Sequence, residues 1–228
     1  MLSRVSHTNN FKLWGWFMVR FRFFLIIAAL VSPAVAFGKN VLMMVPDDFM
    51  WPEYELPLTA YKKDGHTVKV AGKYRGEVKP DRRNSSEFPT SRAVTVDMTF
   101  DEVKVEDFDA ITFVAGNGAW HDFFPNETVH KIVQTAFDKE KVIGLLCAST
   151  GLLGLVGNFD GNGKPIAEGR KVVGYFRVEG ILTKLGKVKF VAGDRKAPAA
   201  VIDGNLVTGR NPESSQVFAE KVVELLRK

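Results

Sequence analysis

Residues 142–151 have the sequence VIGLLCASTG, in which an apolar run leads directly into small residues beginning at Cys147. This pattern predicts a buried β-strand over 142–146, a sharp turn at Cys147 and a short apolar helix reaching about Val156. A nucleophile on such a turn projects out of the sheet. The N–H groups and positive dipole end of the following helix favour a thiolate, so the thiol pKa is expected below its free value of about 8.5.

Cys147 is the only cysteine of the chain, so no internal disulfide is available to it. Its local pattern fits a reactive thiol and a small buried hydrophobic residue equally well.

The surrounding sequence alternates short apolar runs with amphipathic stretches, a pattern that favours βαβ units and a mostly parallel sheet. Strands are predicted over Val41–Val45, Thr67–Val70, Ala110–Val114, Lys171–Gly174, Val188–Val191, Ala199–Ile202 and Leu206–Thr208. Helices are predicted over Trp51–Lys63, Asn126–Phe137 and from Asn211-Pro212 onward, with Phe218, Val222, Leu225 and Leu226 on one face of the last. Asp203-Gly204-Asn205 indicates a hairpin turn between the last two strands. Lys73–Arg92 is polar and without a clear period, as expected of a loop that walls a pocket or mediates dimer contact.

The first 36 residues have the pattern of a cleavable secretory signal peptide. Basic residues without acidic ones precede a short apolar run over Phe23–Val31, and an Ala-x-Ala site ends at Ala36. Cleavage there leaves Phe37 as the mature N-terminus of a single domain over 37–228 and places it in the periplasm or medium. Met18 is an alternative start, and an uncleaved anchor is the alternative interpretation.

The leader accounts for most of the basic charge. The chain has 31 basic and 26 acidic residues, and four basic residues lie in the leader, so 27 remain against 26. The mature domain is therefore nearly neutral, and its charge predicts neither a nucleic-acid partner nor a stable attachment to the membrane.

The segments Asp109–Gly116, 142–151 and Val201–Thr208 together resemble the ThiJ/PfpI family, which includes intracellular-protease-like proteins and the parkinsonism-associated deglycase. The resemblance covers nearly all of Asn40–Lys228. It implies a flavodoxin-like, three-layer α/β sandwich with a nucleophile elbow, commonly a homodimer, that acts on small molecules without a cofactor.

The resemblance assigns Glu53 as the acid partner of Cys147, because Glu53 has the family's spacing to Pro57 and to the turn at Gly65-His66. Pro57 cannot donate to the carbonyl of Glu53, which loosens the helix start. A carboxyl beside a thiolate would stay protonated and donate to the sulfur. The alternative is a carboxylate that complements the helix N-terminus, a role open equally to Glu55.

The resemblance further implies an oxyanion hole formed by the N–H groups of Gly116 and Ala148. The alternative for Gly116 is a turn that only needs a small residue.

The chain departs from the family at both histidine positions, which here hold Ala148 and Tyr175. Leu145 is bulkier than the usual residue, and Ser149 replaces a glycine. No base for peptide hydrolysis is thus identified, and peptidase activity is not expected. His121, in the loop after the third strand, is a candidate pocket residue by location alone, whereas His66 and His130 are interpreted as structural. No cluster has metal-ligand spacing.

Three functions follow as hypotheses. The first is an exported cysteine-dependent enzyme of the hydrolase, glyoxalase or deglycase type that acts on small carbonyl compounds. The second is a redox or stress-response protein in which Cys147 oxidises reversibly. The third is a ligand-binding scaffold with a pocket near Trp51, Trp120 and Tyr175.

Overall fold

The computed structural model describes residues 38–82 and 92–228. The predicted leader, the alternative start at Met18 and the predicted mature N-terminus at Phe37 lie outside these residues. Within the described ranges, no helix is both long and apolar enough to span a membrane.

A seven-stranded sheet in the order β10-β11-β7-β6-β1-β2-β5 forms the centre of the domain. All neighbouring strands pair in parallel except β10 and β11, which form the predicted antiparallel hairpin. The central strands are buried on both faces, as their apolar sequences require. The strands are β1 Asn40–Met44, β2 Thr67–Gly72, β5 Met98–Thr99, β6 Ala110–Phe113, β7 Val142–Leu146, β10 Ala200–Asp203 and β11 Leu206–Gly209.

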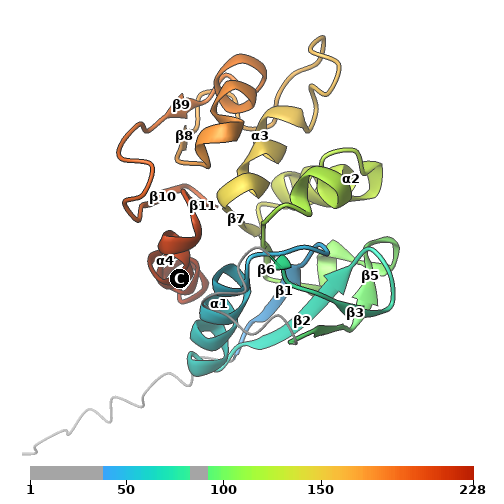
Figure 1. Cartoon of the computed structure of the whole chain (residues 1–228). Helices are drawn as coiled ribbons and strands as arrows, with labels where there is room; N and C mark the ends of the chain where they lie inside the picture. The colour runs from blue at the N-terminus through green and yellow to red at the C-terminus, as the bar shows by residue number, and fades with distance from the viewer. Residues whose placement is uncertain (1–37, 83–91) are drawn as a thin grey trace, which may run out of the picture. The chain divides into compact units, whose positions relative to one another are not determined.

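Helices cover both faces of the sheet and complete a three-layer, flavodoxin-like α/β fold. The chain moves one way along the sheet from β1 to β2 and the other way from β6 to β7, so right-handed crossovers place α1 and α2 on opposite faces. Helix α4 packs beside α1 (Figure 1). The α-helices are α1 Trp51–Lys63, α2 Glu127–Asp138, α3 Leu152–Leu155 and α4 Ser215–Leu226. Five-residue π-helical turns lie at Ala119–Phe123 and Ile181–Leu185.

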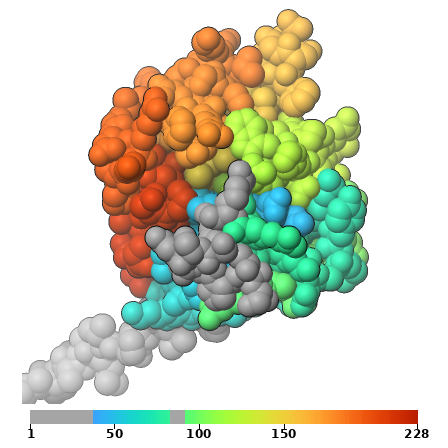
Figure 2. Space-filling view, viewed as in Figure 1, coloured from blue at the N-terminus to red at the C-terminus, as the bar shows by residue number. Residues whose placement is uncertain are grey.

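The short strands differ from the sequence prediction in two ways. The strands predicted at Lys171–Gly174 and Val188–Val191 are present but shorter, as β8 Lys171–Val172 and β9 Lys189–Phe190, and they pair with each other outside the central sheet. The predicted loop over 73–92, of which residues 83–91 lie outside the described ranges, contains β3 Gly76–Val78, which pairs with β4 Val94–Val96. A strand of three residues is too short to show a period. Figure 2 shows the chain from β8 onward, in orange and red, gathered on one side of the domain.

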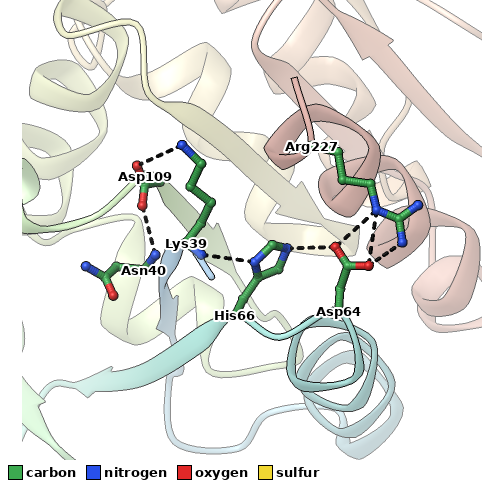
Figure 3. Close-up of polar contacts among 6 residues, drawn as sticks. All are labelled: Lys39, Asn40, Asp64, His66, Asp109 and Arg227. Carbon is green, nitrogen blue, oxygen red and sulfur yellow. Dashed lines mark hydrogen bonds and ion pairs between the residues drawn. The ribbon is translucent and has the colours of Figure 1, made fainter. Parts of the chain in front are cut away.

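The end of the sheet at which β1 begins is joined to both helices of one face. The backbone N–H of Lys39 donates to His66 Nδ1 at 3.2 Å, and His66 Nε2 lies 3.2 Å from Asp64 (Figure 3). Arg227 at the end of α4 pairs with the same Asp64 carboxylate. Burial lowers the pKa of His66. These contacts agree with the interpretation of His66 as a structural residue. The candidate site lies at the opposite end of the sheet.

Candidate active site at the carboxyl ends of the central strands

Three predicted site residues follow the carboxyl ends of adjacent strands. Glu53 lies in the first turn of α1, which follows β1. Gly116 follows β6, and Cys147 follows β7 directly. Parallel strands end at the same edge of the sheet, where ligands gather in doubly wound folds. The topology therefore brings together residues that lie far apart in the sequence.

Cys147 occupies a strained elbow. Its φ is +57°, in the left-handed region that side chains other than glycine rarely adopt, at a cost of about 1–3 kcal/mol. A 3₁₀ turn over Cys147–Gly151 continues into α3, so the predicted short helix is present but begins more tightly wound.

Hydrogen bonds within the turn maintain this conformation. The buried hydroxyl of Ser149 accepts from the N–H of Leu146 at 2.9 Å and lies 2.7 Å from the carbonyl of the same residue. Thr150 Oγ1 donates to the Cys147 carbonyl at 2.7 Å, and the N–H of Tyr175 donates to it at 3.4 Å. Ser149, which stands where the family has a glycine, thus stabilises the backbone conformation of the elbow through its hydroxyl.

We expect Ser149→Ala to lower the free energy of unfolding by about 1–3 kcal/mol, because the buried N–H of Leu146 would lose its partner. Urea denaturation measures this change. Thr95→Ala, at an exposed position of β4, serves as the control and should alter stability by less than about 0.5 kcal/mol. Equal effects of the two substitutions would show that the hydroxyl does not fasten the elbow.

Glu53 is fully buried beside the thiol. Its Oε2 accepts from the N–H of Ala115 at 2.8 Å, whereas Oε1 has no directed hydrogen-bond partner. Burial raises the pKa of Glu53 to about 7, against the lowering effects of the Ala115 N–H and of Cys147. The carboxyl is therefore held where it exchanges a proton near neutral pH, a property of general acids and bases. Glu55 instead accepts from Trp51 Nε1 at 2.6 Å, so the two acids have different roles.

The expectation of a lowered thiol pKa was wrong in its direction. Cys147 is 4% exposed, and its burial, followed by the charge of Glu53, raises the pKa of the thiol. The N–H of Ala148 interacts with the sulfur and lowers this pKa, but by less. Local sequence showed the helix N-terminus and could not show the depth of burial. The two groups are coupled, because the charge of Glu53 raises the pKa of the thiol.

A pocket of about 550 Å³ opens beside the elbow. It is lined by five residues that the sequence singled out, namely Cys147, Gly116, Ala148, Trp120 and Tyr175. Pockets of this size hold small organic ligands.

Gly116 has a conformational requirement of its own. Its φ is +131°, and a Cβ there would lie 2.6 Å from the carbonyl oxygen of Asp48. Only glycine allows this approach between the loops that follow β1 and β6. The turn therefore requires glycine, which agrees with the alternative interpretation of Gly116 as a residue needed for its small size. Gly116 also lines the pocket, a position that is compatible with a backbone N–H donor to an oxyanion.

Two predicted pocket residues lie elsewhere. His121 is exposed and does not line the pocket, because it lies in the same π-helical turn as Trp120 and projects in a different direction. Trp51 is buried against Phe49 and Tyr54. No histidine lines the pocket in the described part of the chain.

Several lining residues were not predicted. They come mainly from the segments after β8 and β9 and from the start of the last helix: Met50, Asp81, Asn117, Phe176, Arg177, Arg195, Lys196, Asn211, Pro212 and Glu213. Asp81 belongs to the segment over 73–92, for which a pocket wall or a dimer contact was predicted, and its position agrees with the first alternative. The charged residues stand in polar stretches whose local pattern carries no sign of a site.

Across residues 38–82 and 92–228, no group of three or more histidine, cysteine, aspartate or glutamate side chains is arranged to hold a metal ion. The arrangement that is present offers a thiol and backbone N–H groups on the pocket wall, with the fully buried Glu53 carboxyl, whose pKa is raised, next to the thiol. Such a set can perform nucleophilic addition to a polarised carbonyl or stabilise an oxidised sulfur.

Fold and site define a flavodoxin-like α/β protein with a cysteine on its nucleophile elbow. Residues 39–225 match the model of the DJ-1/PfpI family, to which the chain therefore belongs. Deglycase PfpI of Pyrococcus furiosus is 27% identical, over 82% of this chain and 99% of its own length. General stress protein 18 of Bacillus subtilis is 25% identical, over 84% of this chain and 99% of its own length. The crystal structure of Drosophila melanogaster DJ-1beta superimposes with a TM-score of 0.69 at 22% identity, covering 83% of this chain and 91% of that one.

Proposed function

We propose that the protein is a cysteine-dependent enzyme acting on small reactive carbonyl compounds. The observation that carries the proposal is the buried Glu53 carboxyl, with its pKa raised to about 7, beside Cys147 on a strained elbow in a ligand-sized pocket. The relatives named deglycases support the same reaction class.

In the proposed reaction of a 2-oxoaldehyde, the sulfur of Cys147 bonds to the aldehyde carbon and the carbonyl electron pair moves to oxygen. The N–H groups of Gly116 and Ala148 stabilise this oxygen, and it receives the thiol proton through Glu53. Glu53 then takes the proton from the same carbon and returns it to the neighbouring carbon, while the proton of the new hydroxyl passes to the neighbouring carbonyl oxygen, so that the hemithioacetal becomes a thioester. Water hydrolyses the thioester, so the net reaction adds one water and yields a 2-hydroxy acid.

Cys147→Ser is expected to reduce consumption of phenylglyoxal by about 10²-fold or more, because a neutral hydroxyl is a much weaker nucleophile than a thiol that can ionise. Loss of substrate absorbance measures the rate, and a denaturation curve confirms that the variant is folded. Consumption that survives this substitution would refute the proposed nucleophile.

A redox role is the second candidate, and the absence of histidine from the described pocket lining favours it. Oxidation of Cys147 by peroxide gives a sulfenic acid and water, and a second peroxide gives a sulfinic acid. The N–H of Ala148 and a protonated Glu53 are placed to bind the new oxygens. Ready sulfinate formation by a protein that consumes no dicarbonyl would favour this candidate. A thiol that alkylates only after denaturation would leave ligand binding alone.

We also propose that the chain is exported by cleavage after Ala36. The basic start, apolar run and Ala-x-Ala site support this step. The protein recovered from the periplasm or medium should begin at Phe37, which intact-mass measurement checks. Recovery of a protein that retains residues 1–36 would contradict the proposal.

A further inference from the structure

Three cationic residues, Arg177, Arg195 and Lys196, line the same pocket as Cys147. In the parts of the chain that the structure describes, no carboxylate forms an ion pair with any of them. Unpaired cations that share one concave surface are available to a ligand.

Two of these cations are held on one aromatic ring. The guanidinium of Arg195 lies 4.6 Å from the centroid of Phe176, and that of Arg177 lies 5.7 Å from it. Cation–π contacts restrict the side chains without consuming their charge or their N–H donors. Two like charges that contact one ring repel each other, and a bound anion that contacts them would relieve this repulsion.

Buried side chains fix the backbone that carries Arg195. Arg210 donates to the carbonyls of Asp194 at 2.9 Å, Ala197 at 3.3 Å and Val191 at 3.4 Å. Asn211 Nδ2 donates to the carbonyl of Arg195 itself at 2.9 Å. The segment over 191–197 has only the two-residue strand β9 before it, and these donors replace the missing regular structure. The backbone position of Arg195 is thus fixed by Arg210 and Asn211, which are buried.

The Phe176 ring that carries these two arginines is in turn packed against the elbow. Phe176 stacks edge-on against Tyr175 with their centroids 4.6 Å apart, and the N–H of Tyr175 donates to the Cys147 carbonyl. The pocket also contains the acidic Asp81 and Glu213, and the charge of Glu213 acts on both Glu53 and Cys147. The negative charge of Glu213 therefore acts on the thiol side of the pocket, whereas the positive charges of Arg177 and Arg195 lie at Phe176. A ligand with an anionic end has one favourable orientation in this field.

We propose that the pocket binds a small organic oxyanion, with its carboxylate or phosphate between Arg177 and Arg195 and its remaining part directed toward Cys147. Guanidinium groups suit both oxyanions through paired N–H donors. Resting on the proposed enzymatic function, the inference names the substrate class as carbonyl compounds that bear a carboxylate or phosphate group away from the reacting carbon.

Binding is tested in Cys147→Ser, in which the chemistry is removed and the cationic residues remain. Calorimetric titrations with mandelate, phenyl phosphate and neutral mandelamide compare two anions with an uncharged ligand of similar size. We expect at least one anion to bind about tenfold more tightly than the amide, and the tighter of the two identifies the oxyanion. Added Arg195→Gln or Arg177→Gln should remove most of this preference, while Arg75→Gln, exposed and outside the pocket, should leave it.

Equal affinities for anions and amide, or a preference that survives both arginine substitutions, would overturn the inference. The outcome is separate from that of the enzymatic proposal. Anion binding by Cys147→Ser alongside an inactive wild type would refute only the enzyme. Turnover of phenylglyoxal without anion preference would refute only the cationic subsite.

Discussion

Replacing Glu53 by glutamine is expected to reduce dicarbonyl consumption by about 10²–10⁴-fold. The proposed reaction requires Glu53 to take and return protons, and an amide does neither at neutral pH. The fold should tolerate the change, because a glutamine carbonyl still accepts from the N–H of Ala115 and its amide N–H₂ is placed to reach the sulfur. Phenylglyoxal consumption by both proteins at equal concentration gives the ratio.

The same variant separates the enzyme from the redox protein. Sulfinate formation needs only a hydrogen bond at this position, so the mass shift of Cys147 after dilute peroxide should be nearly unchanged in Glu53→Gln. Glu55→Gln is the matched control, since Glu55 is on the same helix and contacts Trp51 and Arg92 instead of the thiol. Full turnover by Glu53→Gln would remove Glu53 from the proposed chemistry, and a large loss in Glu55→Gln would show a general effect on α1.

The stability of the wild-type protein is expected to carry a pH dependence that comes from Glu53. Burial raises the pKa of this carboxyl from 4.5 to about 7 in the folded protein, so between these values the folded state binds more protons than the unfolded state. The contribution of Glu53 is therefore fully favourable below pH 4.5 and is lost as pH rises through 7. The full loss is of the order of 3 kcal/mol.

Glutamine does not titrate, so Glu53→Gln lacks this loss. Urea denaturation of both proteins is measured at intervals from pH 4 to pH 8. Over this range, the free energy of unfolding of the variant should rise relative to that of the wild type by roughly 3 kcal/mol. Subtracting the free energy of unfolding of the wild type from that of the variant cancels the contributions of the other titrating groups. One of these is His66, whose lowered pKa makes stability rise with pH. A difference that is constant with pH would mean that Glu53 has the same pKa in the folded and unfolded states, and that burial does not raise it.

The long apolar strands and amphipathic helices could be predicted because their periods are local. The ranges of α1 and β7 agree with prediction, and those of β1 and α2 differ by one residue at each end. Strands β3 and β4 could not be predicted, because three residues show no period, and the predicted strands at Lys171–Gly174 and Val188–Val191 are reduced to the two-residue strands β8 and β9. The separation of β8 and β9 from the central sheet is decided by partners elsewhere in the chain.

At the site, the local pattern of a strand that runs into small residues pointed to Cys147. The family resemblance added Glu53, Gly116 and Ala148, which local features alone did not distinguish from a helix-terminal acid and a turn that needs a small residue. The place of His121 depended on the direction of one side chain in a helical turn, which composition does not specify. The role of Ser149 required knowledge of which backbone groups the elbow leaves buried.

The sequence by itself determined the fold class and the elbow with its cysteine, because both follow from residue type and short-range periodicity, whereas the acid partner Glu53 was assigned by the family resemblance. Tertiary structure alone decided the proton affinities and the cationic side of the pocket. Desolvation of Cys147 and Glu53 depends on everything that packs around them. Arg177 and Arg195 meet at Phe176 only because Arg210 and Asn211, from the end of β11, hold a distant loop in place.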